Sequence, residues 1–139
     1  MATSGYSGTP LIKKLGINPG LSVRLVNHPD NYFELLEADI SDQLSRGETV
    51  PDLVHLFVKS QKEFETEINK LKKLIPKNPN MVIWVSWYKK SSGITTDVTE
   101  DTIRNYALKN DLVDIKVCAV SEIWSGLKLV VPVAKRKQK

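Results

Sequence analysis

The chain has 139 residues, enough for one domain whose hydrophobic core needs neither disulfide nor metal. Hydrophobic residues make up 41% and charged residues 26%, the balance usual for a soluble globular protein. The net charge of +4 lies in a tail without acidic residues, at Lys135, Arg136, Lys137 and Lys139. Elsewhere 16 basic side chains are balanced by 16 acidic ones, which argues against a protein whose whole surface binds nucleic acid.

Cysteine usage and apolar runs exclude further classes of protein. Cys118 is the single cysteine, so an internal disulfide and a zinc site built on several thiolates are excluded. No apolar run approaches eighteen residues, and residues 1–10 lack the basic and apolar parts of a signal peptide. We therefore expect no membrane association, a cytoplasmic location, no metal, and a buried position for Cys118 in an apolar strand.

The first part of the chain predicts one strand and two short helical segments. Residues 1–10 are rich in Gly, Ser and Thr and predict an irregular arm, followed by a helical turn at residues 11–15. A strand is expected at residues 21–27, and a two-turn helix at residues 31–37. Residues 38–50 permit either a short edge strand or a single helical turn.

The middle of the chain predicts two strands buried on both faces, with a helix between them. Residues 53–58 (LVHLFV) and the run that begins at Met81 are apolar without alternation, which is typical of parallel strands covered by helices. Ser60 and Glu63 form a capping box at the start of a helix with one apolar stripe. His55, inside the first of these strands, is expected to be a hydrogen-bonded core residue.

The last third predicts a helix and an antiparallel hairpin. Either Asp97 or Thr99 caps a helix that includes Ile103. Two strands follow in immediate succession, at residues 112–120 and 123–133. They must pair antiparallel, because a parallel crossover needs a dozen or more residues between them.

Together these elements predict a single α/β domain at residues 11–133, followed by a basic, disordered tail at residues 134–139. Right-handed crossovers place helices on both faces of a three-layer, mostly parallel sheet. We expect the first strand and the strands at Leu53 and Met81 to be parallel neighbours. The hairpin strands lie beyond them, with the Leu127 strand antiparallel and the Met81 strand away from both edges.

A helix followed by a terminal antiparallel hairpin resembles the second half of the Rossmann-like S-adenosylmethionine-dependent methyltransferases. The resemblance implies a shortened version of that fold, with its second-strand region reduced to residues 38–50. The family's Gly-rich loop after the first strand, where glycines allow the cofactor to approach, is here VNHPDNYF and has no glycine. We therefore expect that the chain binds neither S-adenosylmethionine nor another cofactor.

Six segments resemble a family of small bacterial proteins catalogued as a domain of unknown function. They are GYSGTPL (5–11), KLGINPG (14–20), VHLFVKS (54–60), WVSWYKKSSGITTD (84–97), TEDTIR (99–104) and VDIKVCAVSEIWSGLKLV (113–130). The resemblance covers nearly the whole chain. It implies a relationship and brings no known activity.

Candidate ligand-binding residues gather where the parallel strands end, because ligands of open α/β sheets bind at that edge. They are His28, Lys59, Ser86, Trp87, Lys89, Lys90, Thr96, Asp97 and Trp124. The lysines could receive a phosphate or carboxylate, and the tryptophans could stack on a flat ligand. The alternatives are tryptophans packed in the core and loop side chains that cap helices or face solvent. No spacing defines a nucleophile or a general base, so we name no catalytic residue.

The sequence thus predicts a non-catalytic binding or regulatory module with an unidentified small molecule or protein as its partner. Its recognition surface is expected on the loop of residues 84–97 and the turn at Trp124. Two alternatives stay open. One is an enzyme, either a reduced methyltransferase or another activity at the same edge. The other, less favoured, is a nucleic-acid accessory protein that uses the basic tail together with Lys89 and Lys90.

Overall fold

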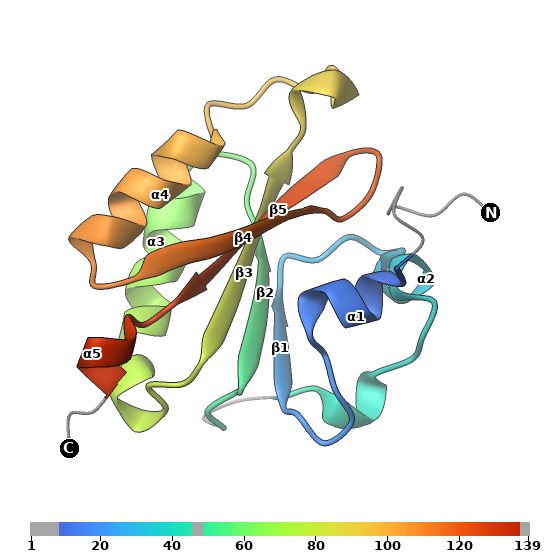
Figure 1. Ribbon diagram of the computed structural model, residues 1–139. Helices are drawn as coiled ribbons and strands as arrows, with labels where there is room; N and C mark the ends of the chain where they lie inside the picture. Colours follow the sequence, from blue (N-terminus) through green and yellow to red (C-terminus); the bar gives the residue numbers. More distant parts are fainter. Residues whose placement is uncertain (1–8, 46–48, 137–139) are drawn as a thin grey trace.

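Figure 1 shows the computed structural model, which describes residues 9–45 and 49–136. One five-stranded sheet of order β1-β2-β3-β5-β4 runs through the molecule. The strands are β1 (Val23–Val26), β2 (Leu53–Phe57), β3 (Val82–Tyr88), β4 (Val113–Ala119) and β5 (Trp124–Val130). Strands β1, β2 and β3 pair parallel, and β5 pairs antiparallel with both β3 and β4. The predicted neighbours, the antiparallel β5 and the central place of β3 are confirmed.

Helices cover both faces of this sheet, so the predicted three-layer, mostly parallel α/β architecture is confirmed. On one face lie α3 (Gln61–Lys72) and α4 (Glu100–Lys109), and on the other lie α1 (Leu11–Leu15) and α2 (Tyr32–Leu36) (Figure 1). Shorter elements are the 3-10 turns η1 (Ser41–Gln43), η2 (Ile75–Lys77) and η3 (Lys90–Ser92), and the helical turn α5 (Val133–Arg136). Among the residues that the structure describes, no helix has the length and apolar character needed to cross a membrane.

Each face of the sheet carries its own hydrophobic core, because successive strand residues point to opposite sides. Ile83 and Leu127 pack toward α3, whose Phe64 is fully buried. Trp84 packs on the opposite face, where its indole Nε1 donates to the carbonyl of Leu15 at 2.9 Å and holds α1 against the sheet. This bond explains why a five-residue helix, too short to be stable alone, has a defined place.

We call the core between the sheet and α1 and α2, which contains Trp84, the second core. Gly126 on β5 marks a close approach within it. A Cβ at this position would lie 3.1 Å from Val120 Cγ2 and 3.3 Å from Trp84 Cε3, closer than ordinary side-chain contact. The absence of a side chain at Gly126 therefore lets the hairpin pack directly on the Trp84 ring.

The described part of the segment at residues 38–50 has the predicted helical turn, and an isolated bridge where the alternative was a short edge strand. It contains the 3-10 turn η1, and Leu44 forms an isolated parallel bridge with Val23 at the edge of the sheet. The strand expected at residues 21–27 is shorter, because regular pairing is confined to Val23–Val26.

The end of the chain differs from the predicted tail. Residues 134–136 belong to α5, although disorder was expected from residue 134. Lys135 Nζ donates to Asp111 Oδ1, and Arg136 Nε donates to the carbonyl of Val131 at 2.7 Å. Basic side chains that the sequence suggested were free in solvent thus attach this turn to the domain. Residues 137–139, and residues 1–8 of the predicted arm, lie outside the described part.

Candidate functional site

The nine predicted site residues lie near the carboxyl ends of the parallel strands, but the structure divides them into an inner and an outer group. The inner group is fully or nearly fully buried: Ser86 is 0% exposed, and Trp87 and Trp124 are each 7% exposed. The outer group lies at or near the surface and comprises His28, Lys59, Lys89, Lys90, Thr96 and Asp97. A ligand on the surface could contact the outer group only.

A buried chain of hydrogen bonds crosses the second core and contains Ser86. Tyr32 Oη lies 2.7 Å from His55 Nδ1, and His55 Nε2 lies 2.7 Å from Ser86 Oγ. The three residues come from α2, β2 and β3. A neutral imidazole has one donor and one acceptor nitrogen, so either tautomer completes the chain. This confirms the predicted core role of His55, and Tyr32 is the partner that sequence reasoning missed.

Burial keeps the members of this chain uncharged. Desolvation, with a smaller contribution from the charge of His28, lowers the pKa of His55 to about 3. Burial also raises the pKa of the Tyr32 hydroxyl well above its usual range. A serine beside a histidine suggests a nucleophile, but both side chains are 0% exposed and no substrate atom could reach them. The Tyr32–His55–Ser86 hydrogen bonds therefore join α2 to the centre of the sheet.

The rings of both predicted site tryptophans, Trp87 and Trp124, pack against other residues inside the protein. Trp87 belongs to the core beneath α3 and α4. Trp124 stacks on Tyr88 with ring centroids 4.5 Å apart, and it forms a T-shaped contact with Phe57 with centroids 4.9 Å apart. Aromatic faces engaged in this way are not available for stacking on a flat ligand. Of the two roles left open for these tryptophans, the structure supports packing.

Asp97 caps α3, not the following helix α4. Its Oδ1 accepts from the backbone N–H of Gln61 at 2.9 Å, and the Gln61 side chain returns a bond to the Asp97 carbonyl. Thr96 assists, because its hydroxyl donates to the carbonyl of Lys59 at 2.8 Å. The cap of α4 is Thr99, whose Oγ1 accepts from the N–H of Thr102.

Ser60 and Glu63, at the start of α3, also bond within the protein itself. Ser60 Oγ accepts from the N–H of Glu63, as the predicted capping box requires, while Glu63 Oε1 accepts from Lys59 N–H at 2.7 Å. The other carboxylate oxygen of Glu63 receives the side-chain amide of Asn27, which follows β1 with φ 57°. Helix N-termini at this edge are where anionic ligands bind. Here carboxylates of the protein occupy that position.

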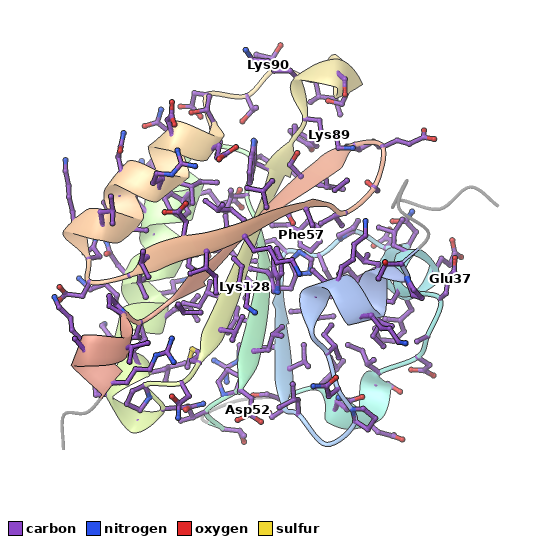
Figure 2. All side chains as sticks on the ribbon, in the orientation of Figure 1. Glu37, Asp52, Phe57, Lys89, Lys90 and Lys128 are labelled. Carbon is purple, nitrogen blue, oxygen red and sulfur yellow. The ribbon has the colours of Figure 1, made fainter. Side chains whose placement is uncertain are left out.

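The outer surface of this edge joins the two segments that the sequence suggested for recognition. The N–H of Lys89 donates to the carbonyl of Ile123 at 2.8 Å, so the end of β3 lies beside the turn before Trp124. Ile94 and Ile123 are 41% and 43% exposed, and Lys90 is exposed nearby in sequence. Figure 2 labels Lys89 and Lys90 at this end of the molecule. The surface therefore combines apolar and cationic groups.

A cavity of about 390 Å³ lies at the opposite, amino end of the sheet. Its walls include Ile75, Pro76 and Pro79, with Lys72 and Lys135 as cations. Lys72 Nζ donates to Asn110 Oδ1 at 2.6 Å, and Lys135 Nζ donates to Asp111 Oδ1, so both ammonium groups already have hydrogen-bond partners. Across residues 9–45 and 49–136, no group of three His, Cys, Asp or Glu side chains could hold a metal ion.

No protein-family model matches this chain, and no curated protein matches it. Among solved structures, it is similar to a protein in the NADB-Rossmann superfamily from Streptococcus agalactiae, with a TM-score of 0.46 and 8% sequence identity. The match covers 88% of this chain and 68% of that protein. The fold assignment depends instead on the strand order and directions described above, in which three parallel strands are followed by an antiparallel hairpin.

Proposed function

We propose that this protein is a non-catalytic binding or regulatory module on a degenerate methyltransferase-like fold, related to the small bacterial family that its six segments resemble. Its recognition surface comprises the outer part of the loop at residues 84–97 and the adjoining turn at residues 121–124. Lys90, Ile94 and Ile123 are the exposed groups on which this proposal depends. A mixed cationic and apolar surface suits a macromolecular partner better than a small cofactor.

The internal hydrogen bonding of the Gln61 and Glu63 N–H groups, at the N-terminus of α3, is the observation that carries the proposal. In a nucleotide-binding α/β protein, free backbone N–H groups at this edge receive a phosphate or carboxylate. Here Asp97 takes the N–H of Gln61, and Ser60 takes the N–H of Glu63. A ligand anion would have to displace Asp97 and would meet the charge of Glu63. Both effects oppose a cofactor in this position.

The buried hydroxyl of Ser86 supports the same proposal. It is the one candidate nucleophile among the predicted site residues that has a histidine partner, and both residues lie wholly inside the core. General-base catalysis requires that the substrate come within hydrogen-bond reach of such a pair.

Calorimetry with S-adenosylmethionine at millimolar concentration tests this proposal. We expect no saturable heat, because the chain has no glycine in its first loop and its own carboxylates at the start of α3. A methyltransferase that binds the cofactor, titrated in the same buffer, is the positive control. Clear saturation with this protein would contradict the proposal and favour an enzyme.

A further inference from the structure

Four lysines, from α1, the loop after β3, β4 and β5, lie around Cys118 on the sheet face that carries the second core. Lys116 on β4 and Lys128 on β5 are directly opposed in the antiparallel register, next to the Cys118 and Gly126 pair. The charges of Lys14 on α1, of Lys89 after β3 and of Lys116 all act on the Cys118 thiol. They partly oppose the burial that raises its pKa. We call Lys14, Lys89, Lys116 and Lys128 the lysine cluster.

The cluster lies beyond the part of this face that α1 covers. Lys128 neighbours Trp84 across the β3–β5 pair, and Trp84 is the residue whose indole holds α1. On the outer side of that contact, Lys128 is half-buried and Lys116 is exposed. In the view of Figure 2, Lys128 lies between the hairpin strands and α1, on the face that carries α1.

The placement of Lys116 opposite Lys128 lowers the stability of the isolated protein. Like charges directly opposite on a sheet destabilise it, and two neutral side chains would avoid the repulsion. Within residues 9–45 and 49–136, none of the ion pairs involves Lys14, Lys116 or Lys128. Local rules of stability are most often broken where a surface serves binding.

We propose that the lysine cluster binds an acidic segment of a protein partner. The inference rests on the proposed binding function and extends its recognition surface from the end of β3 onto β4 and β5. Charge complementarity identifies the occupant, because carboxylates placed between Lys116 and Lys128 would convert their repulsion into attraction.

A protein segment fits this surface better than a nucleic acid. Outside the basic tail the chain is neutral by count, with 16 basic and 16 acidic side chains, so the cluster is a local patch. Single-stranded nucleic acids also need free aromatic faces for base stacking. Trp84 is fully buried on this face, and Trp124 and Tyr88 stack on each other.

Fluorescence anisotropy of a labelled decaglutamate peptide, with the full chain at 50 mM and 200 mM salt, tests the proposal. We expect binding that weakens with salt, and at least a tenfold loss of affinity in the double variant Lys116→Gln/Lys128→Gln. The matched control is Lys62→Gln/Lys77→Gln, which removes the same charge from exposed positions elsewhere and should change affinity less than twofold.

Three results would overturn the proposal. The first is equal affinity in both double variants. The second is tighter binding of a ten-nucleotide single-stranded DNA than of the peptide, which would assign the cluster to nucleic acid. The third is a melting temperature of the Lys116 and Lys128 variant well below wild type, because removing a repulsive pair should keep or raise it. Saturation with S-adenosylmethionine would instead contradict the proposed function and leave the peptide result standing.

Discussion

At the scale of single residues, His55 is an ionisable side chain held wholly out of water. It is fully buried between Tyr32 and Ser86, and burial holds its pKa near 3, against 6.5 for an unperturbed histidine. The unfolded chain therefore binds a proton on His55 at pH values where the native protein does not. The contribution of His55 to the free energy of unfolding is complete above about pH 6.5 and is lost as the pH falls toward 3.

We predict that this residue makes unfolding easier in mild acid. Linkage gives a loss of about 2 kcal/mol in the free energy of unfolding between pH 7 and pH 5 from His55 alone. Urea denaturation at both pH values should show that loss in wild type and in the exposed-histidine control His28→Gln, and a smaller loss in His55→Gln. If the latter variant does not fold, the imidazole pKa measured by NMR decides, and a value near 6.5 would refute the prediction.

At the scale of elements, the loop after β3 is tied to the start of α3 by Asp97 and Thr96. We predict that Asp97→Ala lowers the free energy of unfolding by about 1 kcal/mol, because the Gln61 N–H at the start of α3 loses its acceptor while the Ser60 cap remains. Asp97→Asn should cost less, since its side chain keeps an acceptor. The control is Asp30→Ala, at an exposed position of the loop after β1. Chemical denaturation measures all three, and an unchanged midpoint for Asp97→Ala would show that the cap contributes nothing.

At the scale of the whole molecule, the two cores share one sheet, whose centre and edges differ in protection. Strands β2, β3 and β5 each have a strand on both sides, whereas β1 and β4 terminate the order. We predict that amides of β2, β3 and β5 exchange slowest with deuterium, near the rate of global unfolding, and that β4 exchanges faster. Exchange followed by NMR checks this. Protection of β4 equal to that of β3 would mean that something pairs with the edge, most simply a second copy of the chain.

Much of this architecture could be predicted because its signals are local. The unbroken apolar runs LVHLFV and MVIWV predict buried parallel strands, and the lack of space for a helix between β4 and β5 forces them to be antiparallel. The capping box at Ser60 and Glu63 predicts the first turn of α3 in the same way. Each of these patterns involves neighbours in sequence, so tertiary structure had little freedom to change the outcome.

The candidate site depended on contacts between distant residues, which local patterns do not contain. Asp97 precedes α4 and is a suitable cap for it, yet its carboxylate accepts from the backbone N–H of Gln61 at the start of α3. The sequence places Ser86 near the end of a strand and so predicts a ligand-binding residue, but the pairing of β3 with β2 places it against His55 in the core.

The amino-acid sequence by itself determined the strands, the main helices, the direction of the hairpin and the neutral body of the chain. Only the tertiary structure decided which polar side chains face solvent and which charges meet. Lys116 and Lys128 are opposed because the register of β4 on β5 sets them so, with a shift between Asp114 and Lys116. Such a register depends on packing across the whole sheet, since a slip of one residue would turn each side chain to the other face.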